Sequence, residues 1–115
     1  MDVIGVCKLI FEVVVEIKEM ADTAKWNKKQ CIRFGERCDI FTTAMDHLEF
    51  DVSTYANALI NTKNIVEEIR DFMKKFQGPF TMMNKLNLMR TASADRDEFA
   101  NLNKKLSEAS ADLKL

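Results

Sequence analysis

The fold is decided by the segment Val3–Ile17, which reads VIGVCKLIFEVVVEI. Only four of its residues are not apolar, namely Gly5, Lys8, Glu12 and Glu16. At about 100° per residue on a helix, these four fall within an arc of roughly 80°. A helix that packs on one side needs an apolar arc of only about 100°. The sequence therefore predicts a helix over residues 2–22 that is apolar around most of its circumference.

Apolar residues three and four apart predict a second and a third helix. The second covers residues 25–47, with a stripe at Cys31, Phe34, Cys38, Phe41, Met45 and Leu48. The third begins after residue 51, with Asp51 or Ser53 as its N-cap. Its stripe is Tyr55, Leu59, Val66, Ile69, Met73 and Phe76. Gln77-Gly78-Pro79 ends this helix, because proline cannot continue it.

The last helix is predicted to begin at Ser93, a residue type that caps helix N-termini. Asp95, Asp97 and Glu98 would then lie at the positive end of the helix dipole. The stripe of this helix is Phe99, Leu102, Leu106, Ala109 and Leu113. The spacing between Phe80 and Met89 also permits a short extra helix before it.

Length and composition agree with one all-α domain. The chain has 115 residues, 47% of them hydrophobic, with three glycines and one proline, so few residues interrupt helices. Four amphipathic segments with short connections predict a four-helix bundle over residues 1–115. The apolar pattern still runs at Leu113-Lys114-Leu115, which predicts that the chain is the N-terminal fragment of a longer protein.

Several functions are disfavoured by what the sequence lacks. It has one histidine, His47, and no phosphate-binding glycine loop, nucleophile elbow or set of residues at metal-ligand spacing. We therefore expect no enzyme activity, metal or cofactor. The net charge of −1 argues against nucleic acid as a partner. Three cysteines without a CxxC pair indicate reduced, buried thiols in the cytoplasm.

The surplus apolar surface of the first helix has two interpretations. The helix is either the buried centre of the bundle, or it enters a bilayer or meets another copy after the bundle opens. The residues that would insert or self-associate are Val3, Ile4, Val6, Leu9, Ile10, Phe11, Val13 and Val14. In an assembled pore, Glu12 and Glu16 would form acidic rings that attract cations.

The second helix carries basic residues away from its apolar stripe. They are Lys25, Lys28, Lys29, Arg33 and Arg37, and residues 24–35 contain no acid. They form either a solvated helix surface or a surface for anionic lipid headgroups, at about 1 kcal/mol per basic residue near such a membrane.

Two stretches resemble a known family. They are Lys28–Arg37, KKQCIRFGER, and Leu88–Asp95, LMRTASAD, the latter followed by Phe99 and by Leu102–Glu108, LNKKLSE. Their order and spacing resemble the four-helix-bundle cell-death domains of the MLKL and HeLo type. This group includes the N-terminal domains of mixed-lineage kinase domain-like pseudokinases, fungal HeLo domains and coiled-coil domains of some plant immune receptors. The resemblance covers nearly the whole chain and leaves open the choice between the animal and the plant branch.

The resemblance implies an executioner of programmed cell death. In these families a downstream domain of the same protein holds the bundle inactive. On a signal the bundle oligomerises, moves from the cytoplasm to the plasma membrane and permeabilises it. The basic residues of the second helix would then bind anionic phospholipid. The competing interpretation is a helical adaptor that binds a partner protein and never touches lipid.

Overall fold

The chain folds into helices throughout the part that the computed structural model describes, residues 3–46 and 54–115. The elements are α1 (Val3–Thr23), α2 (Lys28–Asp46), α3 (Ala56–Met73) with a 3-10 turn η1 (Lys74–Phe76), and α4 (Met82–Asp112). These residues contain no β-strand. The prediction of an all-α four-helix bundle is therefore confirmed.

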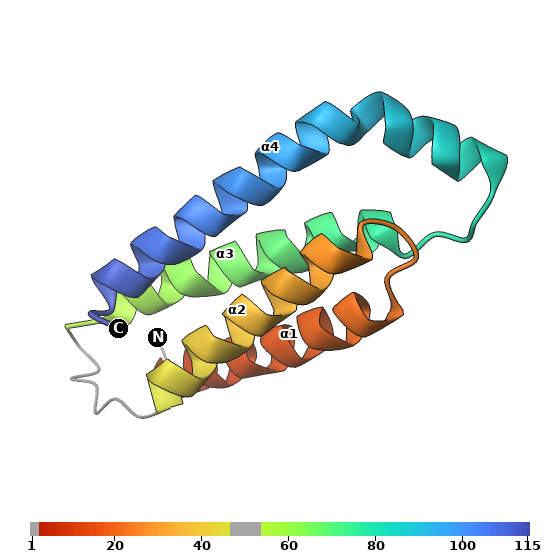
Figure 1. Ribbon diagram of the computed structural model, residues 1–115. Helices are drawn as coiled ribbons and strands as arrows, with labels where there is room; N and C mark the ends of the chain where they lie inside the picture. The colour runs from red at the N-terminus through yellow and green to blue at the C-terminus, as the bar shows by residue number, and fades with distance from the viewer. Residues whose placement is uncertain (1–2, 47–53) are drawn as a thin grey trace.

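The helix α1 holds the first three helices together, because it packs closely against both α2 and α3. The helix α4 lies mainly against α3 and touches α2 (Figure 1). The α1–α2 loop and the α3–α4 linker lie at one end of the bundle, and the start of α1 and the C-terminus lie near the other (Figure 1).

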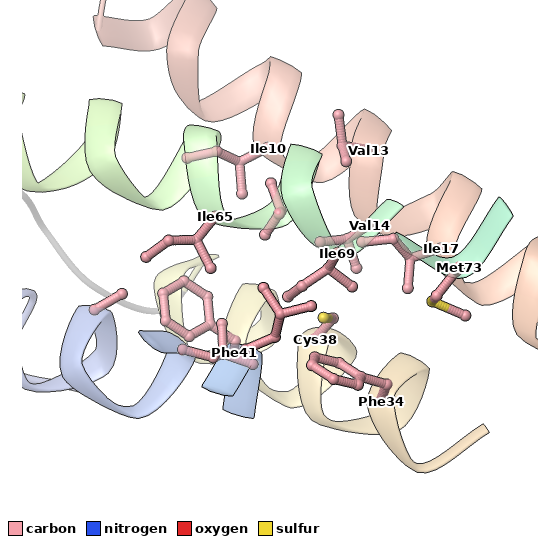
Figure 2. Packing of buried hydrophobic residues seen from close by; sticks show 14 of the residues in the cluster. Ile10, Val13, Val14, Ile17, Phe34, Cys38, Phe41, Ile65, Ile69 and Met73 are labelled. Carbon is pink, nitrogen blue, oxygen red and sulfur yellow. The ribbon is translucent and has the colours of Figure 1, made fainter. Parts of the chain in front are cut away.

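Burial in the core explains much of the apolar character of α1. The buried residues of this helix are Val3, Val6, Ile10, Val13, Val14, Ile17 and Ala21. Figure 2 shows Val14 and Ile17 near Ile69 and Met73 of α3, with Phe34 of α2 on another side. Burial against two helices requires a wider apolar arc than burial against one. The interpretation of this helix as the buried centre of the bundle therefore describes only part of it, since Ile4, Leu9 and Val15 of α1 are exposed.

The predicted stripes of the other helices also face the core. The buried residues include Cys31, Phe34, Cys38, Phe41, Met45, Leu59, Val66, Ile69, Met73, Phe76, Phe99, Leu102, Leu106, Ala109 and Leu113. Tyr55 is half-buried, and the structure adds Thr62 and Ile65 to the buried side of α3. The predicted positions of His47, Leu48, Asp51 and Ser53 lie outside the described residues.

A glycine sets the approach of α2 to α1. A Cβ atom at Gly35 would lie 3.3 Å from Cβ of Ala21 and 3.7 Å from Cα of Lys18. Glycine inside a helix costs about 1 kcal/mol relative to alanine. Here the missing side chain allows the two backbones to approach, and an ion pair of 3.3 Å between Lys18 and Asp39 bridges the same two helices.

The second helix begins at Lys28, so the predicted start at Lys25 is wrong. Asn27 has a φ of 48°, in the left-handed region that asparagine tolerates better than most residues, and this interrupts the helical path. The backbone N–H groups of Lys25 and Trp26 both donate to the carbonyl of Phe76, at 2.9 and 3.2 Å. This loop is therefore fastened to the end of η1.

The prediction that Ser93 begins the last helix is also wrong. The helix α4 starts at Met82 and continues without a break, so the expected short separate helix is its first part. Thr81 is the actual N-cap, since its Oγ1 accepts a hydrogen bond of 3.1 Å from the backbone N–H of Asn84. Ser93 lies exposed inside the helix, where a side chain that faces water need not interrupt it.

Asp95 lies at the middle of α4, where it is buried, and not at a helix N-terminus. Its Oδ1 lies 2.6 Å from Nζ of Lys75, and its Oδ2 accepts a hydrogen bond of 3.0 Å from the Thr91 hydroxyl. Nearby, the Phe99 ring lies 4.9 Å from Phe72 between centroids. These contacts attach α4 to the end of α3 and to η1.

Because Ile69 is fully buried between α1 and α3, Ile69→Ala should lower the free energy of unfolding by about 2–5 kcal/mol. Ile4→Ala is the matched control, since Ile4 is 77% exposed and its loss should change that free energy by about 0.5 kcal/mol or less. Urea unfolding followed by circular dichroism measures both. Equal losses for the two variants would contradict a core centred on α1.

Candidate functional site

The basic residues in the loop before α2 and in its first turns are exposed and form no ion pair with the carboxylates of the described residues. Lys25, Lys28, Lys29 and Arg33 all face solvent. Nζ of Lys28 donates to the backbone carbonyl of Asp22 at 3.0 Å. Within residues 3–46 and 54–115, none of the four forms an ion pair with a carboxylate. Their positive charge is therefore available to an external anion.

Arg37, the fifth predicted headgroup residue, has a different setting. Its Nη1 donates to Oδ1 of Asn103 at 2.6 Å, and its Nη2 donates to Oγ of Ser107 at 3.0 Å. The guanidinium therefore ties α2 to α4. A hollow of about 200 Å³ lies beside it, lined by Gln30, Arg33, Phe34, Arg37, Phe99 and Asn103. Two guanidinium groups at its border suit a phosphate or a carboxylate.

Most of the predicted insertion residues on α1 are not accessible. Val3, Val6, Ile10, Val13 and Val14 belong to the core. Phe11 is partly buried against that core, whereas Ile4 and Leu9 are 77% and 45% exposed. Insertion of the whole set into a bilayer would therefore require α1 to separate from α2 and α3.

The two predicted pore acids lie on the outer surface of the bundle. Glu12 and Glu16 are both exposed. Oε2 of Glu16 lies 3.7 Å from Nη1 of Arg70, which connects α1 to α3. A role in a pore would require these carboxylates to leave this position and to meet those of other copies.

An exposed apolar segment at the start of α4 was missed by the sequence reasoning. Its residues are Phe80, Met82, Met83, Leu86 and Met89, which are between 53% and 73% exposed. The available signal was the spacing of 82, 86 and 89, one helical face that no predicted bundle stripe uses. Because the last helix was predicted to begin at Ser93, this segment belonged to none of the predicted bundle stripes.

The basic and the apolar residues meet at one end of the bundle. The indole Nε1 of Trp26 donates to the carbonyl of Gly78 at 2.9 Å, and the Trp26 and Phe80 rings lie 5.1 Å apart between centroids. Residues 24–35 and 80–94 together contain six basic residues and no acid, while Lys74 and Lys75 pair with Asp71 and Asp95. This end therefore combines a local positive charge with exposed apolar side chains.

Cys31 and Cys38 are buried thiols that stay protonated at neutral pH, and Cys7 is half-buried. Burial raises the pKa of Cys31 to about 11 and that of Cys38 to about 12, and it also raises the pKa of Cys7. Thiols with such pKa values stay protonated and are poorly reactive. The described residues also hold no group of three or more histidine, cysteine or acidic side chains arranged for a metal ion.

Among the helices of the described ranges, none has both the length and the apolar character needed to cross a bilayer.

Comparison of the chain with protein-family models, with curated proteins and with solved structures found no match. The family resemblance of Lys28–Arg37 and Leu88–Asp95 therefore remains a prediction from sequence.

Proposed function

We propose that this chain is a membrane-targeting cell-death domain that binds anionic lipid, self-associates and permeabilises the plasma membrane. The observation that carries the proposal is that exposed basic residues at the start of α2 and exposed apolar residues at the start of α4 lie at one end of the bundle, where Trp26 contacts Phe80. A protein surface that combines basic residues with exposed apolar residues suits the boundary between lipid headgroups and acyl chains. The sequence resemblance supplies the later steps, self-association and permeabilisation.

Electrostatic attraction would bring the domain to the membrane. Lys25, Lys28, Lys29 and Arg33 each contribute about 1 kcal/mol near an anionic surface. Together they support reversible binding, which weakens as salt shortens the screening length to about 8 Å at physiological ionic strength. A cytoplasmic domain with this surface would collect at the inner leaflet of the plasma membrane, where anionic lipid is enriched.

Permeabilisation would follow from opening of the bundle. In the structure, α1 buries most of its apolar face against α2 and α3, so this surface is inaccessible while the bundle is closed. Opening would expose the predicted insertion residues to the bilayer or to other copies. Glu12 and Glu16 would then lie one helical turn apart on the polar side of α1 and could line a cation pathway.

Charge reversal tests the lipid-binding step. The triple variant Lys28→Glu/Lys29→Glu/Arg33→Glu should lose sedimentation with phosphatidylcholine vesicles that contain phosphatidylserine or phosphoinositide, because its attraction to the anionic surface becomes repulsion. Lys8→Glu/Lys104→Glu/Lys114→Glu is the matched control, since these exposed lysines lie elsewhere and the net charge is identical. Binding that is unchanged in the first variant, or equally lost in both, would contradict a role for this surface.

A reversible crosslink tests the opening step. Lys18→Cys/Asp39→Cys in a Cys7→Ala background should be linked across α1 and α2 by a flexible, reducible bis-maleimide, because the native side chains at these exposed positions bridge the two helices through an ion pair of 3.3 Å. The crosslinked protein should still bind anionic vesicles but release little trapped dye. Reduction should restore the leakage of the uncrosslinked protein. Equal leakage in both states would show that α1 need not separate from α2.

The second candidate function is the adaptor. It is favoured by a groove of about 240 Å³ between α2 and the end of α4, lined by Arg37, Ile40, Phe41, Ala44, Leu106, Ser110 and Leu115. Ile40 is 70% exposed there, so a partner helix could cover it. A domain that binds no vesicle of any tested composition, yet loses a defined protein partner on Ile40→Asp, would favour the adaptor.

A further inference from the structure

Phe80 and the first part of α4, residues 80–94, extend beyond the packed bundle, and we name them the overhang. At about 1.5 Å per residue, the 31 residues of α4 span about 46 Å, against about 31 Å for the 21 residues of α1. Figure 1 shows the start of α4 reaching past the ends of the other helices. No residue of the overhang is buried, whereas Asp95 directly after it is.

The overhang is amphipathic in its own right. On a helix of about 3.6 residues per turn, Met82, Leu86 and Met89 fall within an arc of about 60°. Leu88 and Thr91 lie on the opposite side and are half-buried, so that side faces the bundle. The methionine and leucine stripe consequently points away from the protein into solvent.

Basic residues border the stripe on both sides. Lys85 and Arg90 each lie about 40° outside the apolar arc, one on either side. Long basic side chains in such positions can keep their charged ends among headgroups while their stems follow an apolar surface. No acidic residue occurs between residues 74 and 94, so no charge on this segment opposes an anionic surface.

Aromatic residues complete the same surface. A shallow hollow of about 340 Å³ is lined by Trp26, Phe80, Thr81, Met82 and Lys85. Trp26 is the only tryptophan of the chain, and tryptophan favours the membrane interface because its ring is apolar and its N–H is polar. The hydrogen bond from its indole to Gly78 holds it beside the overhang.

We propose that the overhang inserts its apolar stripe into the interface of an anionic bilayer while the bundle is still closed. This inference rests on the proposed lipid-binding function and names the element that enters the membrane first. Charge complementarity selects the occupant: the charged residues of the overhang, Lys85 and Arg90, are both basic, which suits anionic phospholipid and disfavours a second copy of the same positive surface. The residues of α1 would enter only later.

Tryptophan fluorescence provides a direct test, because Trp26 adjoins the overhang. The full chain is mixed with phosphatidylcholine vesicles, with and without phosphatidylserine, that carry bromine on the acyl chains as a quencher. We expect Trp26 to be quenched only when phosphatidylserine is present. Leu86→Asp/Met89→Asp should abolish this quenching and weaken vesicle affinity by about tenfold or more, because two insertion residues become charged.

The matched control is Val15→Asp/Ile40→Asp, which also adds two charges at exposed apolar residues, away from the overhang, and should leave quenching and affinity unchanged. Circular dichroism checks that each variant keeps the helicity of the wild type. The measurement is repeated with Lys28→Glu/Lys29→Glu/Arg33→Glu, which should remove binding altogether.

The outcomes separate this inference from the proposed function. Binding that depends on the α2 charges but not on Leu86 and Met89, without quenching of Trp26, overturns insertion of the overhang and retains lipid binding. Absence of wild-type binding to every vesicle overturns both. Self-association in lipid-free solution that is lost in Leu86→Asp/Met89→Asp assigns the stripe to a second copy and also overturns the inference.

Discussion

Burial of α1 between α2 and α3 is the constraint on which the rest of the structure depends. It requires a helix that is apolar over most of its circumference, and it requires α2 to approach closely enough at Gly35 to contact Ala21. Because α1 packs closely against both neighbours, it sets how they lie relative to each other, and α4 then lies mainly against α3. The same burial withholds Val3, Val6, Ile10, Val13 and Val14 from solvent, whereas Ile4, Leu9 and Val15 of α1 stay exposed. In the closed bundle, most of the predicted insertion residues therefore cannot reach a membrane.

The difference in length between α4 and α1 leaves a surface that stays exposed in the closed bundle. The helix α4 is about ten residues longer than α1, so it cannot be covered along its whole length. Phe99, packed on the phenylalanines of α3 and η1, and Asp95, paired with Lys75, hold it where the bundle ends. The part before Asp95 is left with an exposed stripe, the loop that follows α1 places Trp26 against Phe80, and the basic residues of α2 begin at the same end of the bundle. One end of the molecule thereby acquires both features of an interfacial surface.

The fold was predictable because its signals are local. Cys31, Phe34, Cys38 and Phe41 repeat with helical spacing and are buried, and the same holds for the stripe from Phe99 to Leu113. The errors came from residues whose role depends on tertiary context. Ser93 has the chemistry of an N-cap but lies inside α4, while Thr81 caps it, and Lys25 is held in a loop by the carbonyl of Phe76. For the site, the exposed basic residues of α2 followed from the helical pattern, with Arg37 the exception because α4 supplies its partners. The exposure of the overhang did not follow from the helical pattern, since it results from the relative lengths of helices that are distant in sequence.

The central claim is that the end of the bundle formed by the start of α2 and the overhang is the surface that docks on an anionic membrane. Hydrogen–deuterium exchange of the full chain, with and without phosphatidylserine-containing vesicles, tests it most directly. We predict slower exchange in residues 24–33 and 80–94 on binding, with little change at the opposite end, in residues 106–115. Protection confined to residues 37–44 and 106–115, around the groove that contains Ile40, or no protection by any vesicle, would contradict the account.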